Sequence, residues 1–465
     1  MEQYQIENNK LLTSFIERHY YNDPNKGIEL FIRAKCPSNC VYCYFKKHGH
    51  ELYPEDKQTD EQILNNLGIF LDYYIKKQFT KDISLFSGEF IIDGLFSKMM
   101  QIFYDKFANQ YYKPHAIIIA DDGDFISYSE KIQEVEDWIA RLDSIGIKLH
   151  FSLSVDGKYM DINRSRGQRD DTYYKTLIDF CDKHFFAFHP MVSAFNIDKW
   201  IDNYNWWYSV LDDFQFSRLM LLEVRDDNWT NDKIQEYLKF LNYIIEDIFK
   251  NRYHGNHELM AQRITNQLYY TTASYDPLTI PCFLDEAGCD YFGMCCTIKT
   301  NLCVRLGDLA IVPCHRTTYP QFVNGHFEVI DGKIKGIVCE NYEILSAIGS
   351  WNRNSAPRCN FCKIKQWCNG GCLGSNFEST HELFIPPKTV CNFMQAKYKF
   401  LIMKYESMGL MPYIKNHLST FQYKYIEDYM DTLSKEVLIY GRLLSDRIND
   451  AQHQGKSIKQ FSNLS

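Results

Sequence analysis

The chain has 465 residues, so at about 100 to 200 residues per domain it should fold as two or three units. Hydrophobic residues make up 45% and charged residues 24%, which excludes a largely disordered, collagen-like or low-complexity chain. A net charge of -8 argues against nucleic acid as the main partner. Neither a signal peptide nor a run of about eighteen apolar residues occurs, so we expect a cytoplasmic protein with no membrane partner.

Short apolar runs alternate with helical patterns over the first 230 residues. Helical periodicity covers stretches such as Asp60–Gln78 and Asp171–His184. Six β/α units in series predict an α/β fold, a partial (β/α)6 barrel whose chemistry lies on the loops after its strands. The runs predict strands at Ile28–Ala34, Asp82–Ser87, Ala116–Ala120, Lys148–Ser154, Phe186–Val192 and Phe216–Glu223.

The composition changes after the predicted barrel, which we place at residues 1–230. A helical connector at 231–281 leads to a segment, 282–395, that holds twelve of the 16 cysteines. In a reducing compartment, closely spaced thiols are metal or redox ligands more often than disulfides. We therefore expect a loop-rich module held together by metal, followed by a helical C-terminal extension at 396–465.

Three cysteines, Cys36, Cys40 and Cys43, directly follow the first predicted strand. A C-x3-C-x2-C loop can hold three irons of a [4Fe-4S] cluster and leave the fourth iron open to a ligand. This loop, with Tyr42 before its third cysteine, resembles the signature of the radical SAM enzymes. The resemblance implies that the open iron binds S-adenosylmethionine and that an electron cleaves it to a 5'-deoxyadenosyl radical. A zinc loop or unrelated core thiols is the alternative interpretation.

Residues at the ends of later strands extend the resemblance. Ser87–Phe90 stands where the family has a Gly-Gly-Glu-Pro type motif, although Ser87 and Phe90 depart from it. The family motif implies that the methionyl ammonium of S-adenosylmethionine binds here, and that an arginine takes its carboxylate, with Arg166 favoured over Arg164 by spacing. The cofactor-binding residues implied are Tyr42, Gly88, Glu89, Ser154, Asp156, Arg164 and Arg166.

The second cysteine group has the pattern C-x2-C-x5-C-x3-C, followed after eighteen residues by a fifth cysteine. This pattern resembles the SPASM domain, an extension of radical SAM enzymes with two auxiliary [4Fe-4S] clusters, so three clusters are implied. A structural zinc ribbon is the alternative. The resemblance assigns Cys359, Cys362, Cys368 and Cys391 to one auxiliary cluster, and Cys372, Cys314, Cys303 and either Cys296 or Cys295 to the other.

The resemblance also implies a substrate class, since SPASM-type enzymes act mostly on peptides and proteins. Relatives that mature sulfatases carry an aspartate base directly after the cysteine equivalent to Cys314. Here His315 follows, which is a candidate base or an ordinary loop histidine. We expect a precursor peptide as substrate and ferredoxin or flavodoxin as electron donor. A separate leader-binding protein is a further expectation, because only 35 residues precede Cys36.

Three alternatives to a peptide maturase stay open at this point. They are a radical SAM dehydrogenase of a small molecule, a sulfatase-maturing enzyme that forms formylglycine, and a non-catalytic iron-sulfur or zinc protein. The sequence names neither the modified residue nor the bond formed.

Overall fold

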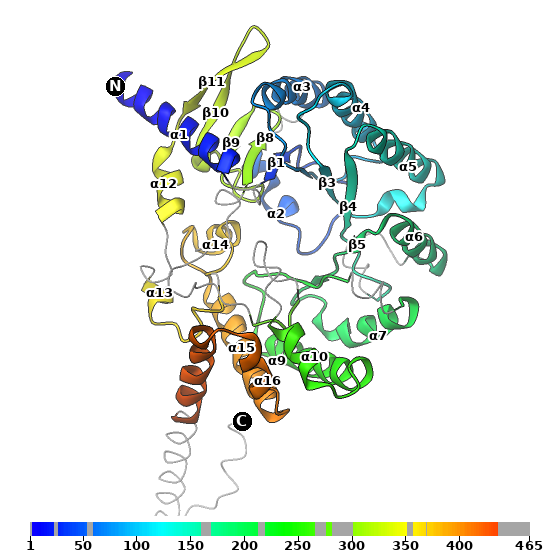
Figure 1. Cartoon of the computed structure of the whole chain (residues 1–465), viewed down its shortest axis with the longest axis vertical. Helices are drawn as coiled ribbons and strands as arrows, with labels where there is room; N and C mark the ends of the chain where they lie inside the picture. Colours follow the sequence, from blue (N-terminus) through cyan, green and yellow to red (C-terminus); the bar gives the residue numbers. More distant parts are fainter. Residues whose placement is uncertain are drawn as a thin grey trace, which may run out of the picture.

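The computed structural model describes residues 2–22, 27–53, 59–159, 169–212, 219–265, 276–280, 301–350, 357–368 and 370–435. A nine-stranded sheet with the order β11-β10-β9-β8-β1-β2-β3-β4-β5 forms its centre (Figure 1). The strands are β1 (Gly27–Phe31), β2 (Ile83–Phe86), β3 (Ala116–Asp121), β4 (Lys148–Leu153), β5 (Ala187–Phe188), β8 (Asn301–Arg305), β9 (Ala310–Val312), β10 (Gly325–Ile330) and β11 (Lys333–Cys339). The fold is therefore α/β, as predicted.

The strands β1 to β5 are parallel to their neighbours, and helices connect them. The predicted helix at Asp171–His184 is present with those bounds, and it begins after Asp170, whose side chain accepts a hydrogen bond from the amide of Tyr173. The barrel helices are α2 (Tyr44–Leu52), α3 (Asp60–Lys76), α4 (Leu95–Phe107), η2 (Asp124–Ser127), α5 (Ser129–Ser144), α6 (Asp171–His184), η4 (Ile197–Lys199) and α7 (Trp200–Val210).

The two faces of the parallel strands differ in burial. Ile83 and Leu85 of β2 belong to the buried core, whereas the alternate residues Ser84 and Phe86 are only half-buried. The same alternation continues along β3 and β4. Strands covered on both faces are buried at every position, so this alternation in burial indicates one face packed against helices and one face turned toward a more open interior.

The predicted strand Phe186–Val192 is divided into β5 and β6 (Met191–Val192). Pro190, which has no amide hydrogen to donate, lies between the two. The ladder to the sixth strand still continues, because the amides of Met220, Leu222 and Val224 donate to the carbonyls of Phe188, Pro190 and Val192. The sixth strand itself is β7 (Leu222–Glu223), which pairs in parallel with β6.

The cysteine-rich part contains more regular structure than the loop-rich module we expected. Its strand β8 pairs in parallel with β1, and β9, β10 and β11 continue the same sheet in antiparallel order. The helix α1 (Glu2–Asn22) packs beside β11 at this edge, where Asn9 accepts a hydrogen bond from the amide of Cys339. The domain boundaries given above stay a prediction.

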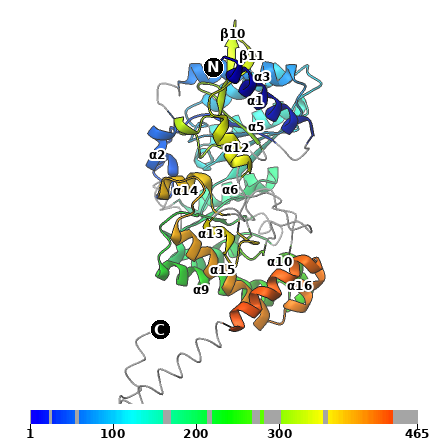
Figure 2. The ribbon, with the colours of Figure 1, turned by 90° about the vertical axis from the view of Figure 1, so that its left-hand side faces the viewer.

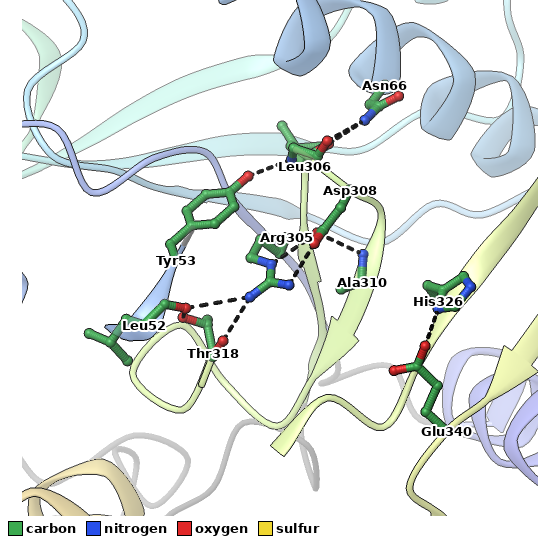
Figure 3. A network of polar contacts seen from close by, with 11 residues as sticks. Leu52, Tyr53, Asn66, Arg305, Leu306, Asp308, Ala310, Thr318, His326 and Glu340 are labelled. Carbon is green, nitrogen blue, oxygen red and sulfur yellow. Dashed lines mark hydrogen bonds and ion pairs between the residues drawn. The ribbon is translucent and has the colours of Figure 1, made fainter. Parts of the chain in front are cut away.

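Polar side chains tie the β8–β9 turn to the barrel (Figure 3). Arg305 forms a bidentate ion pair with Asp308 and donates to the carbonyls of Leu52 and Thr318. Asn66 of α3 donates to the carbonyl of Leu306 over 2.8 Å. Buried charge-assisted bonds of this kind hold a turn in one position, so the turn is held against the end of α2 and against α3.

Helices form the other end of the molecule (Figure 2). Trp229 stacks on Phe393 of α15 with ring centroids 4.2 Å apart, which joins the two helical segments. A buried ion pair between Lys397 of α15 and Glu223 of β7 lies beside this aromatic core. The helices at this end are α9 (Asn231–Asp247), η5 (Ile248–Arg252), α10 (His257–Ile264), α13 (Pro357–Asn360), α15 (Lys388–Ser407) and α16 (Met411–His417), and 420–435 is also helical. The remaining helices are η6 (Pro320–Phe322), α12 (Tyr342–Ser350) and α14 (Leu373–Thr380).

Candidate metal and cofactor site

The loops after the parallel strands meet at one edge of the sheet, where ligands bind in open α/β sheets. The cysteine loop follows β1, and α2 begins directly after Cys43. The amide of Gly88, which follows β2, donates to the carbonyl of Arg33 over 2.8 Å. The amide of Ser154, which follows β4, donates to the carbonyl of Asp121 over 2.7 Å. Backbone pairing therefore continues past the strand ends and brings the predicted motifs together.

Gly88 touches the cysteine loop directly. A Cβ at this position would lie 2.8 Å from the Cβ of Cys36 and 2.7 Å from the carbonyl carbon of Lys35, and it would also overlap the Lys35 oxygen. Carbon atoms in contact are normally about 3.5 to 4.0 Å apart. Only a glycine allows this approach, so Gly88 supports the position of the first predicted cluster ligand.

Glu89 is 6% exposed, and its carboxylate accepts a hydrogen bond of 2.6 Å from the amide of Ile92. Burial raises the pKa of the Glu89 carboxyl, with a smaller contribution from the charge of Asp122. The buried Arg33 donates to the carbonyl of Glu89 over 3.1 Å and forms ion pairs with Asp60 and Asp93. A buried carboxyl with a raised pKa is the kind of group that a cationic ligand would stabilise.

Tyr42 and Asp156, both predicted cofactor-binding residues, contact each other. The Tyr42 hydroxyl donates to one carboxylate oxygen of Asp156, and the amide of Met191 donates to the other over 2.8 Å. Asp156 is fully buried, and its carbonyl accepts hydrogen bonds from Asn203 and Trp207. Asp156 therefore anchors the cysteine loop to the end of β4. The other predicted residues after β4, Arg164 and Arg166, lie outside the described residues.

His315 lies on the inner side of the sheet next to Glu29. Its Nδ1 is 3.2 Å from a carboxylate oxygen of Glu29, and its ring stacks on Phe86 with centroids 4.0 Å apart. The His315 side chain is 26% exposed, whereas Glu29 is buried. Glu29 occupies the same register position as Ser84 on one neighbouring strand and Cys303 on the other, so these side chains share the inner face.

Cys314 and Cys372, which are 58 positions apart in the sequence, interact electrostatically. Burial raises the pKa of the Cys314 thiol to about 12, and the neighbouring Cys372 adds to the shift. Arg316 holds the two segments together through a bidentate ion pair with Glu378 of α14, and a side chain at Gly374 would overlap Arg316. The sequence-predicted pair is thus brought together.

Of the other two predicted members of this ligand set, the structure describes only Cys303. Cys303 is buried in a small cluster with Ala310, Val312 and Val323. Cys296 and its alternative Cys295 lie outside the described residues. The assignment of the nearer auxiliary ligands therefore stays a prediction.

The four cysteines predicted for the other auxiliary cluster line one cavity. Burial raises the pKa of Cys391 to about 11, and the thiols of Cys368 and Cys362 add to that shift, so these three sulfurs lie near one another. The amide of Cys362 donates to the carbonyl of Cys359 over 3.0 Å, which closes a tight turn at the start of the set. The cavity is lined by Cys359, Cys362, Cys368, Cys391, Arg358, Ile364, Lys365, Gly370, Gly371, Pro386, Val390, Met394 and Gln395.

Thiolates in an apolar pocket are soft ligands of the kind that iron-sulfur clusters and zinc require. Within the described ranges, no three His, Cys, Asp or Glu side chains are arranged to hold a single metal ion. The donor set therefore fits the predicted group by its chemistry, and the identity of the group is part of the proposal below.

Three residues of the site were not predicted from the sequence. Glu29 is a carboxylate in the middle of the apolar strand GIELF, and that mismatch could have marked it. Arg33 similarly follows an apolar run. Asn203 lies in α7, a helix rich in aromatic residues, and nothing in the sequence marks it as the residue that donates to the Asp156 carbonyl.

No family model and no curated protein matches this chain. Among solved structures, native anSMEcpe with bound AdoMet is 16% identical, with a TM-score of 0.45. The match covers 82% of this chain and 98% of the anSMEcpe chain. SuiB of Streptococcus suis bound to S-adenosylmethionine is 12% identical, with a TM-score of 0.33. The match covers 83% of this chain and 79% of the SuiB chain.

HydG, a maturase of the [FeFe]-hydrogenase, is 11% identical, with a TM-score of 0.29. The match covers 94% of this chain and 87% of the HydG chain. These scores are too low to establish a shared fold, so the function proposed below is argued from this chain's own residues. In the part of the chain that the structure describes, no helix is long and apolar enough to span a membrane.

Proposed function

We propose that this chain is a radical SAM enzyme that oxidises or crosslinks a ribosomally made peptide. One observation carries the first half of the proposal. The C-x3-C-x2-C loop follows β1, which is parallel to both of its neighbours, and lies against Gly88, the residue before the buried Glu89. Three thiols, with a buried carboxyl for a cationic ligand on the adjoining loop, suit a cluster with one open iron and an amino acid bound to it.

When bound, S-adenosylmethionine and its cluster would supply a carbon radical that removes hydrogen from an unactivated carbon. The chain's own residues would do the rest. Cys36, Cys40 and Cys43 would hold the cluster, and Glu89 would receive the ammonium end of the cofactor. The hydrogen bond between Tyr42 and Asp156 would keep the cysteine loop in place.

The peptide half of the proposal is supported by the second cysteine group, which resembles that of peptide-modifying enzymes. The inner face of the sheet adds His315, held by Glu29 and stacked on Phe86, as a group able to accept a proton from the substrate. A net oxidation needs such an acceptor as well as a sink for an electron, and the auxiliary clusters would be that sink.

The test is deoxyadenosine formation by the anaerobically reconstituted chain under dithionite. The wild type should bind about twelve iron per chain, the sum of three four-iron clusters. Replacing Cys36, Cys40 and Cys43 together by alanine should abolish cleavage and leave about eight iron. Cleavage that survives in this variant contradicts the proposal.

The substrate needs a separate experiment. Incubation with peptides encoded beside the gene should give a product that has lost two hydrogens, together with deoxyadenosine. Turnover of a sugar or another small metabolite, with no change in any peptide, would instead favour a small-molecule dehydrogenase. Conversion of a sulfatase cysteine or serine to formylglycine would favour the sulfatase-maturing alternative.

A further inference from the structure

The segment that carries three of the cavity cysteines is basic in an acidic chain. Residues 357–368, PRCNFCKIKQWC, contain Arg358, Lys363 and Lys365 and no aspartate or glutamate, whereas the chain as a whole has a net charge of -8. Arg358 and Lys363 are exposed, and Lys365 is half-buried. Clustered cations on an otherwise negative protein create a local field that attracts an acidic partner.

An aromatic residue projects from the same segment. Phe361, between Cys359 and Cys362, is 88% exposed, although large aromatic side chains are usually buried. Single exposed apolar residues are ordinary, so exposure alone decides nothing. Phe361 differs because cations flank it and cavity cysteines lie on both sides. Aromatic residues ringed by polar groups are the usual anchors of protein interfaces.

This surface lies directly over the cysteine-lined cavity. Arg358 and Lys365 are part of the cavity lining, and their charges act on the thiols of Cys391 and Cys362 respectively. Cys362 and Cys391 are themselves only half-buried. In Figure 1 the helix α13, which begins this segment, lies at the outer margin of the molecule. A partner seated on the segment would therefore come close to whatever the four thiols hold.

We propose that Arg358, Phe361, Lys363 and Lys365 form a docking surface for a small acidic protein that carries single electrons, of the flavodoxin class. The identity of the cavity's occupant rests on the function proposed above. One electron, received by the cluster of the four thiols from the substrate, would pass on to the flavin, oxidising the cluster and reducing the partner without breaking a covalent bond. Charge complementarity would steer the encounter, and Phe361 would anchor it.

Binding of oxidised flavodoxin to the reconstituted full-length chain tests the surface without relying on turnover. K363E should weaken binding by about tenfold and reduce its dependence on salt, because a charge at the rim of an interface mainly alters association. F361A should weaken binding by about tenfold at every salt concentration, since an apolar anchor is lost. Stopped-flow oxidation of the reduced iron-sulfur clusters by oxidised flavodoxin should slow in parallel.

Two control variants match these changes elsewhere on the surface. K333E makes the same charge reversal at an exposed position of β11, and Y111A removes a side chain that is 87% exposed. Both should bind flavodoxin as the wild type does. If K363E and F361A behave like these controls, or if only an oligonucleotide binds the segment, the docking proposal is wrong.

Dithionite separates this proposal from the one on which it rests. It reduces clusters without docking, so all four variants should form deoxyadenosine under dithionite at the wild-type rate and bind the same iron. Normal dithionite activity combined with unchanged flavodoxin binding would overturn the docking surface alone. Absence of deoxyadenosine in the wild type would overturn the proposed function.

Discussion

Replacing Gly88, in the loop after β2, by alanine should displace the first cysteine loop. The new Cβ would lie 2.8 Å from the Cβ of Cys36 and 2.7 Å from the carbonyl carbon of Lys35. Both neighbours belong to the cysteine loop and neither is the far end of a flexible side chain. The loop itself must therefore move.

The size of that movement follows from the contact distances. Carbon atoms need about 3.5 Å, so relieving the 2.8 Å contact with Cys36 takes about 0.7 Å, and the overlap with the Lys35 oxygen asks for more. Reactive constellations tolerate about 0.5 Å. A misplacement of about 1 Å costs about 100-fold in rate, so G88A should lower deoxyadenosine formation by about 10- to 100-fold.

The assay is deoxyadenosine formation under dithionite, measured together with iron content and thermal unfolding. A matched control is G49A in α2, where the new Cβ would lie 3.6 Å from the Cβ of Ala34, an ordinary contact. G49A should keep full activity, and alanine in a helix should be at least as stable as glycine. Wild-type iron and wild-type cleavage in G88A would refute the steric reasoning.

The remaining predictions concern stability. Y42F removes the hydroxyl that donates to the fully buried Asp156, so denaturant unfolding should show a loss of about 1 to 3 kcal/mol, whereas Y128F at an exposed site should show none. K397M leaves the buried Glu223 without its cation and should lower the free energy of unfolding by about 3 to 5 kcal/mol. The double variant K397M/E223Q should recover much of that loss, because no buried charge is left unpaired. Equal losses in the two variants would contradict this account. Because burial raises the pKa of Glu89, its charge destabilises the fold once the pH exceeds the ordinary carboxyl range near 4.5. E89Q should therefore raise Tm at about pH 8, with a smaller gain at about pH 5, and a gain that grows as the pH falls would show the wrong sign.

Features that depend on neighbouring residues could be predicted from the sequence. The cysteine spacings are themselves sequence facts, and short apolar runs located β1 to β4 close to their observed bounds. The helix Asp171–His184 was predicted with its observed limits, because a 3.6-residue period is a local signal. The division of the predicted strand Phe186–Val192 at Pro190 also has a local cause, the missing amide hydrogen of proline. The prediction missed it because it treated the whole apolar run as one strand.

Tertiary structure decided which of these local features meet. Strand β8 pairs with β1 across more than 260 intervening residues, and no short-range pattern specifies that partner. The same pairing puts Glu29 on the inner face and lets it reach His315. Tyr42 likewise finds Asp156 only because β1 and β4 belong to one sheet. Strand register and loop contacts are set by packing the whole core, whereas thiol spacing and helix periodicity are set within a few residues.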